Sequence, residues 1–361
     1  MSSSRREFLG QAAAVAAGLG AKPFSLSAQP TAMPTARARA FMDLFGLKYP
    51  IGNAGMGRTA TPDLTIAVAN AGALGAVGTG IGVQADFVRQ RVSQTKSGTS
   101  RPFAVNYLLF ADPVTLPVAL DAGAPIIQFS WGIPTSEMAA AIRSAGAKMG
   151  VQISGAAGAR RALDVGADYL ICQGTEAGGH VQGTRALYDV LPAVIEEAKT
   201  IPVLAAGGIA NGAHMRRALI AGASGVLIGT RFLVTKEAGS HEEHKRAIMR
   251  AAAADTVLTV CFADGFPNSP HRVLRNKTLE MWEAAGCPQP GKRPGEGDIL
   301  TTDTVTGEAK RRYSSRSTSR NDQGAVLEMA LYAGEGVDAI RDIPSAGELV
   351  ERLWKECVAA V

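Results

Sequence analysis

The sequence has few aromatic residues (6%) and few charged residues (19%), and no uninterrupted apolar run of 18 or more residues. Without such a run we expect no transmembrane helix, which needs about 20 consecutive apolar residues. Cysteine is also scarce. The chain holds four cysteines at wide and irregular intervals, Cys172, Cys261, Cys287 and Cys357. This spacing matches neither a zinc site nor a dense disulfide framework, so a metal or redox centre built on cysteine is not expected.

The excess of positive charge is confined to the N-terminus. The whole chain has a formal charge of +5, and the first forty residues hold five basic residues against Glu7 alone, a local charge of +4. The rest of the chain therefore carries only about +1. Since the electrostatic footprint of a nucleic-acid-binding protein should lie in its folded domain, this balance gives no support to a nucleic-acid partner.

Residues 1–40 contain a pattern typical of an export signal. Arg5 and Arg6 precede a weakly hydrophobic, alanine-rich run. Paired arginines before such a run resemble a twin-arginine signal. We therefore interpret residues 1–40 as signal peptide and linker and expect a periplasmic or exported protein, with cleavage near residues 27–28 or 38–40. The alternative is a disordered tail with a chance arginine pair, in which case the protein would be cytoplasmic.

One short pattern recurs from residue 41 onward: a small residue, a glycine, usually an alanine, and then an apolar run. Its glycines are Gly72, Gly123, Gly146, Gly166 and Gly222. Each of them can take the left-handed conformation that ends a helix and turns the chain into the next strand. The pattern therefore predicts strands that alternate with helices.

Eight apolar runs of strand length fit between these marks. They lie at residues 49–54, 74–78, 103–107, 125–130, 148–153, 168–172, 201–206 and 225–229. Continuous apolar runs are typical of a parallel sheet that is buried on both faces. Eight strand–helix units in residues 41–235 predict an α/β fold of the (β/α)8 TIM-barrel type. The alternative is an open doubly wound sheet, but the count of eight predicted strands argues against it.

The repeat stops after residue 231. We expect residues 236–361 to form a smaller helical and loop-rich extension that packs on the barrel. Residues 236–285 look helical, whereas residues 286–320 are rich in glycine, proline, serine and charge and should have little regular structure. The basic stretch at 310–316 is interpreted as a solvated loop rather than a polyanion site.

The active site of a (β/α)8 barrel lies at the carboxyl ends of its strands, and the loops after the last two strands often bind phosphate. Around these loops the candidate residues are Gly207, Gly208, Leu227, Ile228, Gly229 and Thr230. Adjacent glycines let backbone N–H groups approach an anion, and a helix N-terminus adds a favourable dipole. The sequence therefore predicts a phosphorylated cofactor or substrate. The alternative is that these glycines serve only tight turns.

His180 is the candidate acid–base residue. It follows Gly178 and Gly179 in the loop after the sixth strand, and the ordinary pKa of histidine lies near working pH. It could act as a general base or as a cation beside developing negative charge, and the alternative is a lone surface histidine. His241 and His244 lack the pattern of a zinc-protease helix, so no metal site is expected.

Two amides and a methionine are expected at the same mouth. Asn106 ends the third strand and Gln173 follows the sixth, and both are suited to hydrogen-bonding a planar heterocycle or its ribityl chain. Met56 lies between two glycines after the first strand and could pack under a ring.

Together these residues resemble the FMN-dependent nitronate monooxygenases, formerly called 2-nitropropane dioxygenases, and the related flavin-dependent enoyl reductases of bacterial fatty-acid synthesis. The resemblance runs from about residue 41 to near the C-terminus. Its most specific part is the run Gln-Gly-Thr-Glu-Ala-Gly-Gly-His at residues 173–180. Other matching segments are residues 50–57, 70–75, 105–106, 205–209, 225–230 and 332–335.

The resemblance implies that FMN is the cofactor and that His180 is the catalytic histidine. It also implies that FMN is contacted by Asn106, Gln173, Gly178, Gly208 and the segment from Leu227 through Ile228 and Gly229 to Thr230. Met56 is expected near the flavin ring. The implied reaction is the oxidative denitrification of a small-molecule alkyl nitronate, in which O2 is used and a carbonyl compound and nitrite are formed.

The chain departs from the family pattern at two positions. Asn53 begins the run Asn-Ala-Gly-Met where Gln-Ala-Pro-Met is commoner, and Glu335 stands where many members have glutamine. We expect both at or near the pocket, where they would bear on the choice of substrate.

Two other functions stay open at the level of sequence. A related enzyme could use NAD(P)H to reduce FMN and pass hydride to an enoyl thioester or a quinone-like acceptor, since barrel enzymes bind nicotinamide without a Rossmann fingerprint. A non-catalytic exported binding protein would keep the glycine loops but would have no need of His180.

Overall fold

The computed structural model describes residues 33–80 and 82–360, which belong to one compact unit, Ala32–Val361. The arginine pair of the expected export signal, Arg5 and Arg6, lies outside the described residues. Within the described ranges, none of the helices has the length and apolar character needed to cross a membrane.

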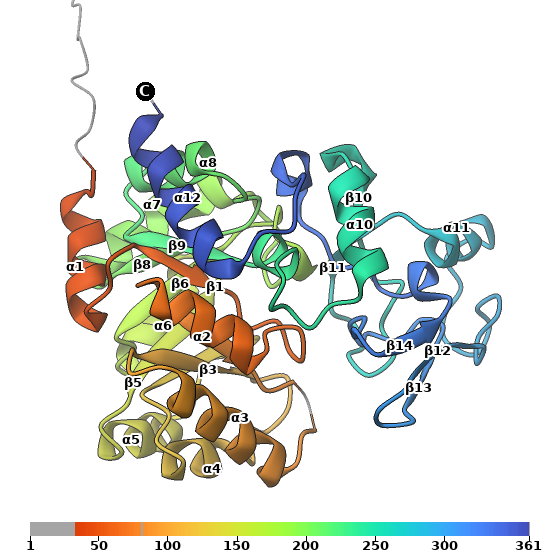
Figure 1. The fold of residues 1–361 in the computed structure, drawn as a ribbon, viewed down its shortest axis with the longest axis horizontal. Helices are drawn as coiled ribbons and strands as arrows, with labels where there is room; N and C mark the ends of the chain where they lie inside the picture. The colour runs from red at the N-terminus through yellow and green to blue at the C-terminus, as the bar shows by residue number, and fades with distance from the viewer. Residues whose placement is uncertain (1–32, 81, 361) are drawn as a thin grey trace, which may run out of the picture. The chain divides into compact units, whose positions relative to one another are not determined.

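Eight parallel strands form a barrel (Figure 1). Their bounds are β1 (Ile51–Asn53), β2 (Gly75–Gly78), β3 (Phe103–Leu108), β4 (Ile126–Ser130), β5 (Lys148–Ile153), β6 (Tyr169–Gln173), β8 (Val203–Ala206) and β9 (Gly225–Ile228). They pair in the order β1-β9-β8-β6-β5-β4-β3-β2, and a parallel bridge from Gly52 to Leu74 closes the ring between β1 and β2. The prediction of a TIM barrel is confirmed, and the open doubly wound sheet is excluded.

Helices follow the strands around the barrel. They are α2 (Pro62–Asn70), α3 (Ala85–Gly98), α4 (Leu116–Asp121), α5 (Ser136–Ser144), α6 (Ala156–Asp164), α7 (Leu187–Ala198) and α8 (Gly212–Ile220). After β9 comes only a short helix, α9 (Thr230–Leu233), while α12 (Ala346–Ala359) contacts both α8 and α2. The helix that completes the ring therefore comes from the C-terminus, within the segment that sequence analysis assigned to the extension.

The recurring glycines do what the pattern predicts. Gly72, Gly123, Gly146, Gly166 and Gly222 all have a positive φ, between 71° and 97°. Each follows a barrel helix and precedes the next strand. This left-handed conformation costs glycine little, because it has no Cβ to clash with the following carbonyl.

An additional helix, α1 (Ala36–Phe45), closes the amino end of the barrel. Thr35 caps its first turn, and the rings of Phe41 and Phe45 pack at 6.1 and 5.5 Å from the ring of Tyr169, which points into the barrel interior. A side chain at Gly150 on β5 would overlap the Tyr169 ring. The amino half of the barrel is thus filled by side chains, and the opposite end is left for a site.

Residues 234–345, here called the excursion, separate α9 from α12 (Figure 1). They contain the helices α10 (Glu242–Arg250) and α11 (Lys277–Ala284) and three 3-10 turns, Ala253–Asp255, Val326–Glu328 and Glu335–Ala339. Their strands are β10 (Thr256–Thr259), β11 (His271–Leu274), β12 (Ile299–Asp303), β13 (Ala309–Arg311) and β14 (Asp322–Gly324). The expectation that residues 236–285 are helical is right for α10 and α11 and wrong at β10 and β11, which pair with each other. Residues 286–320 have little regular structure, as expected, apart from the short strands β12 and β13.

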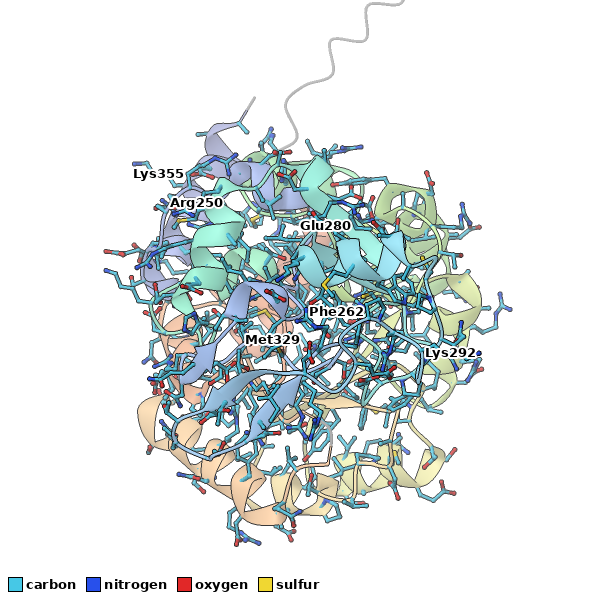
Figure 2. All side chains as sticks on the ribbon, turned by 90° about the vertical axis from the view of Figure 1, so that its right-hand side faces the viewer. Arg250, Phe262, Glu280, Lys292, Met329 and Lys355 are labelled. Carbon is cyan, nitrogen blue, oxygen red and sulfur yellow. The ribbon has the colours of Figure 1, made fainter. Side chains whose placement is uncertain are left out.

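The excursion has its own small core and is tied to the barrel by a strand pair. Phe262 and Met329 are fully buried within it, whereas Glu280 and Lys292 lie on its exposed side (Figure 2). Its strand β11 pairs antiparallel with β7 (Gly179–His180), which follows β6 of the barrel.

Candidate active site

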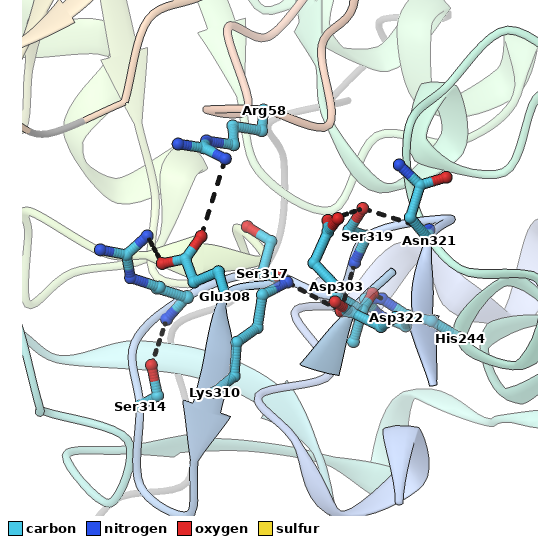
Figure 3. A network of polar contacts seen from close by, with 12 residues as sticks. Arg58, His244, Asp303, Glu308, Lys310, Ser314, Ser317, Ser319, Asn321 and Asp322 are labelled. Atoms are coloured by element: carbon cyan, nitrogen blue, oxygen red, sulfur yellow. Dashed lines mark hydrogen bonds and ion pairs between the residues drawn. The ribbon is translucent and has the colours of Figure 1, made fainter. Parts of the chain in front are cut away.

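A cavity of about 390 Å³ opens at the carboxyl ends of the strands. The barrel side of the cavity is lined by Met56 after β1, Trp131 after β4, His180 in β7 and the start of α9. The other side is lined by residues of the excursion, among them 303, 308, 310 and 315–319 (Figure 3). The predicted residues that line the cavity are Met56, Gln173, Gly178, His180, Gly229 and Thr230. The remaining predicted residues, which do not line it, are Asn106, Gly207, Gly208, Leu227 and Ile228.

The imidazole of His180 has a free, buried nitrogen at this cavity. Its Nε2 atom is shielded from solvent and has no hydrogen-bond partner among the described residues. The pairing of His180 with His271 across β7 and β11 fixes the backbone that carries the ring. A buried nitrogen without a partner is costly, so this atom is available to bond with a molecule in the cavity.

Aromatic rings surround His180. Its ring centroid lies 4.4 Å from that of Phe266, 5.4 Å from Tyr332, 5.5 Å from His271 and 6.0 Å from Trp131. Burial among these rings, with a smaller effect from His271, lowers the pKa of His180 to about 3. The imidazole is therefore neutral at physiological pH in the site as described.

The two other buried histidines are held in place by hydrogen bonds. Nδ1 of His271 lies 2.9 Å from the carbonyl of Ser269, to which it donates, and its Nε2 accepts from the N–H of Phe262. His244 contacts the Thr318 hydroxyl at 2.9 Å and the carbonyl of Tyr332 at 3.2 Å. Burial lowers the pKa of His244 and of His271 to about 4, so both side chains are neutral at physiological pH. Their hydrogen bonds hold the cavity wall around His180 in place.

Gln173 anchors the loop that carries His180. Its Nε2 donates to the carbonyl of His180 at 3.1 Å, and its Oε1 accepts from the N–H of Gln182 at 2.9 Å. Both ends of the amide thus bond to the loop backbone, while the side chain still borders the cavity. Its contribution is to orient the histidine.

Asn106 belongs to a buried chain of polar groups inside the barrel. Its Nδ2 donates to the carbonyl of Gly55 at 3.3 Å, and its Oδ1 accepts from Gln128 at 3.2 Å. The oxygen of Gln128 in turn accepts from the hydroxyl of Tyr169 at 3.2 Å. A Cβ at Gly55 would strike the Asn106 side chain. Asn106 therefore supports the loop that presents Met56 to the cavity.

The glycine loops form a cradle of backbone groups. Gly207 and Gly208 have φ values of 122° and 66°, and the N–H groups of Gly207, Gly208, Gly229 and Thr230 have no acceptor among the described residues. Gly178 packs so closely that an added Cβ would lie 2.8 Å from the Thr230 hydroxyl, which accepts from the N–H of Gly334. Free N–H groups on neighbouring glycine loops suit an anion such as a phosphate.

Leu227 and Ile228 contribute to packing through their side chains. Leu227 lies in the barrel interior, and Ile228 packs in the main core outside the sheet. Any contact of this strand with a cofactor would therefore come from its backbone.

Neither of the two family departures lines the cavity itself, although Asn53 donates to the carbonyl of Ala54, which does. Asn53 bonds through both ends of its amide to the backbone of Ala76, at 2.8 and 2.9 Å, and so bridges β1 and β2. Glu335 forms a 2.9 Å ion pair with Arg272, which also donates to the carbonyl of Thr175. Both side chains therefore stabilise the segments that surround the site.

Comparison with known proteins agrees with this geometry. The family model described as nitronate monooxygenase matches residues 38–117 and 110–356. One relative, from Mycobacterium tuberculosis, is a dehydrogenase of a hydroxy-methyl-oxo-octahydroindene carboxyl-CoA. It is 36% identical over 345 residues, which cover 88% of this chain and 95% of the relative. A nitronate monooxygenase from Paraburkholderia phytofirmans is 27% identical, covering 88% of this chain and 94% of the relative.

A solved structure gives the same fold. The nitroalkane oxidase of Streptomyces ansochromogenes superposes with a TM-score of 0.71 at 30% identity, covering 89% of this chain and 98% of that one. Because the family model and this structure both span the barrel and the excursion, the hypothesis of a non-catalytic binding protein is not supported. The chain belongs to the nitronate monooxygenase family of flavin-dependent oxidoreductases.

Proposed function

We propose that this protein oxidises alkyl nitronates to carbonyl compounds and nitrite, with FMN as its cofactor and O2 as the oxidant. The observation that carries the proposal is the neutral imidazole of His180, whose buried Nε2 has no partner among the described residues and borders the cavity.

The residues at the site fit a flavin with one phosphate. The cavity volume lies in the range of small-molecule sites. The free N–H groups of Gly207, Gly208, Gly229 and Thr230 would hold the phosphate. Met56, Gln173 and Gly178 line the cavity and would contact the rest of the cofactor. When bound, the flavin supplies the electron-accepting ring and the reaction with O2.

His180 is suited to hold a proton near the reacting carbon. A neutral imidazole can accept the α-proton of a nitroalkane at Nε2, and the imidazolium so formed would stabilise the nitronate anion beside it. If Nε2 carries the proton at rest, it would instead donate a hydrogen bond to a nitronate oxygen. Both roles use the same atom, and neither needs a charged histidine at rest.

The wall around His180 would exclude water. Phe266 and Tyr332 pack against one side of the imidazole and Trp131 against its edge. An apolar enclosure strengthens each polar contact inside it and favours substrates with small alkyl groups.

A second candidate function is the oxidation or reduction of a coenzyme A thioester, with or without NAD(P)H. It is supported by the 36% identity to the carboxyl-CoA dehydrogenase, which exceeds the identity to the nitronate monooxygenase named above. The same cavity and the same histidine would serve either substrate.

Anaerobic mixing tests the two functions against each other. The purified protein is mixed with propyl 1-nitronate and, separately, with NADH, and the visible absorbance of the flavin is followed. Bleaching by the nitronate, with nitrite released once air is admitted, supports the proposal. Bleaching by NADH alone favours the second function. Mass spectrometry of the released cofactor tests FMN, and recovery of FAD would contradict it.

We also propose that the protein is exported by the twin-arginine route. The proposal rests on Arg5 and Arg6 and the alanine-rich run that follows them. Because this route carries folded proteins, it would suit an enzyme that takes up its cofactor before export.

A further inference from the structure

The side chain of His214 contacts the backbone of the glycine loop after β8. His214 lies in the first turn of α8, and its Nδ1 accepts a hydrogen bond from the N–H of Ala210 at 3.4 Å. The ring also forms a hydrogen bond with the carbonyl of Gly208. One imidazole therefore holds the loop at two backbone groups, one on each side of Ile209.

The loop depends on this side chain. Within residues 33–80 and 82–360, His214 is the only side chain with a hydrogen bond to the backbone of residues 207–210. The two glycines of the loop have φ values of 122° and 66°. Because glycine loses more conformational freedom on folding than any other residue, a loop built on two of them needs a restraint to keep one conformation.

A neutral imidazole suits both contacts. Burial lowers the pKa of His214, and its hydrogen bond to the carbonyl of Gly208 raises the pKa by a smaller amount. The pKa therefore stays below its ordinary value, and the ring is neutral at physiological pH. In a neutral ring one nitrogen accepts a hydrogen bond and the other donates one, as the N–H of Ala210 and the carbonyl of Gly208 require.

The helix that carries His214 is itself fixed in place. The N–H of Gly212 donates to the Glu356 carboxylate on α12 at 2.9 Å, and the N–H of His214 donates to the side-chain oxygen of Asn211 at 2.8 Å. These two N–H groups of the α8 N-terminus are therefore already used. The N–H groups of the two loop glycines, in contrast, have no acceptor among the described residues.

The excursion packs against the same loop. A Cβ added at Gly336 would lie 2.7 Å from the carbonyl oxygen of Gly208 and 3.0 Å from Cβ of Ala210. Two residues earlier, the N–H of Gly334 donates to the Thr230 hydroxyl at 3.0 Å. The segment 334–336 thus contacts both loops of the cradle, while His214 supplies the side-chain hydrogen bonds to one of them.

We propose that His214 is a positioning residue for the phosphate of the flavin: it fixes the backbone of residues 208–210 and so keeps the N–H groups of Gly207 and Gly208 in place for that phosphate. The inference rests on the proposed FMN cofactor. His214 does not line the cavity, so its effect should be confined to the phosphate and should not extend to the flavin ring.

Riboflavin isolates this effect, because it has the ring and ribityl chain of FMN but no phosphate. The holoenzyme is incubated with FMN and an excess of riboflavin until the bound flavins no longer change, and it is then separated from free flavin. The ratio of bound FMN to bound riboflavin, corrected for their free concentrations, is the phosphate preference. A variant that only loosens the fold weakens the binding of both flavins and leaves this preference unchanged.

The wild type should prefer FMN, and His214→Leu should lower the preference by about tenfold, the usual effect of losing a hydrogen bond. His214→Ser, which is small and polar, should lower it equally and tests the proposal if leucine disturbs the fold. His214→Gln keeps a donor and an acceptor and should retain most of the preference.

His241→Leu is the matched control. Nδ1 of His241 accepts from the N–H of Glu243 at 3.1 Å, the same kind of bond at the N-terminus of another helix, α10. His241 does not line the cavity. This variant should therefore keep the phosphate preference of the wild type.

The same preparations separate this proposal from the oxidation of nitronates. If the preference falls in His214→Leu and His214→Ser while no nitronate is oxidised, the positioning role stands and the proposed reaction fails. If nitronates are oxidised while the wild type, both of these variants and His241→Leu have the same preference, the positioning role is refuted. A wild type that binds the two flavins equally would also refute it, because no phosphate contact would then need support.

Discussion

The backbone N–H of Trp131 donates a 3.0 Å hydrogen bond to the side-chain oxygen of Gln182. Trp131 has a φ of 62°, in the left-handed region that residues with a Cβ rarely adopt. The same oxygen of Gln182 accepts from Nε2 of Gln152 at 2.8 Å, and the N–H of Gln182 donates to Gln173. The side chain of Gln182 therefore holds the strained Trp131 in place, and its backbone N–H ties the loop that carries His180 to Gln173.

Loss of this acceptor should disturb the site more than the fold. In Gln182→Leu the N–H of Trp131 has no partner, and an unsatisfied group of this kind costs about 1–3 kcal/mol. We expect kcat/KM to fall about tenfold and the near-ultraviolet circular dichroism of tryptophan to change. Gln182→Glu keeps an acceptor oxygen and should recover most of both. Unchanged kinetics and spectrum in Gln182→Leu would show that Trp131 needs no support.

The close packing of Gly178 gives a second prediction. In Gly178→Ala the new Cβ would overlap the backbone of Gly334 and crowd the Thr230 hydroxyl. The loops must separate, so we expect loss of most of the bound flavin and a loss of about 1–3 kcal/mol in stability, as is usual for overpacking. The ratio of flavin to protein and the urea midpoint measure these effects.

The matched control is Gly155→Ala. Gly155 follows β5 at the same end of the barrel, and an added Cβ there meets no atom within 4 Å. This variant should keep its flavin and its stability. Equal flavin content in Gly178→Ala and Gly155→Ala would mean that the loop packing at Gly178 does not shape the cofactor site.

Most of the barrel could be predicted from the sequence because its signals are local. A glycine such as Gly72 ends one helix, and the apolar run after it forms the next strand, so both features lie within a few residues. The last unit is different. Its strand β9 and its helix α12 are separated by the excursion, and nothing near residue 228 indicates that the helix starts at Ala346. Only tertiary packing against α8 and α2 identifies it.

The site could be predicted in part for the same reason. His180 and the glycines follow barrel strands, and their position indicates their place at the mouth. Phe266, His271 and Tyr332 come from the excursion and decide the environment of His180. Tyr332 lies in a segment that matches the family, but no periodicity or motif marks Phe266 or His271 or indicates that the three residues meet at His180. The low pKa of His180 depends on this burial and so could not be expected from its sequence position.

The buried histidines predict how stability depends on pH. Burial lowers the pKa of His180 to about 3 and of His244 and His271 to about 4, whereas an unfolded histidine titrates near 6.5. Below about pH 6.5 the unfolded chain therefore binds more protons than the folded one. The contribution of these histidines to the free energy of unfolding is therefore at its maximum above this pH. The free energy of unfolding should fall by up to about 1.4 kcal/mol per pH unit for each histidine as the pH drops toward 4.

Urea unfolding at saturating flavin between pH 8 and pH 4.5 measures this dependence. His244→Gln provides the comparison, because glutamine can donate to Tyr332 and accept from Thr318 without titrating in this range. Its stability should fall less steeply with acid than that of the wild type. Parallel curves for the two proteins would mean that His244 is protonated in the folded state.

The export proposal is tested in cells. Replacing Arg5 and Arg6 together by lysine removes the paired guanidinium groups that the export receptor recognises, and the precursor should accumulate inside the cell. Immunoblots of periplasmic and cytoplasmic fractions measure the outcome, with a cytoplasmic marker protein as the control for leakage. Equal periplasmic yield from the variant would contradict the assignment of residues 1–40 as a twin-arginine signal.

The last prediction concerns the free nitrogen of His180. In His180→Asn the smaller side chain fits the same space, so fold and flavin content should be kept. Turnover should fall by about 10²–10⁴-fold, the usual contribution of a positioned acid–base group. Because burial lowers the pKa of His180 to about 3, the wild-type activity should show no acidic limb from this residue near pH 6.5.

Comparison of a neutral nitroalkane with its preformed nitronate separates two roles of His180. If only the nitroalkane reaction is lost, His180 acts as the base, and if both are lost, it also binds the anion. Full activity of a flavin-loaded His180→Asn on both substrates would show that the unpartnered nitrogen plays no part in the reaction.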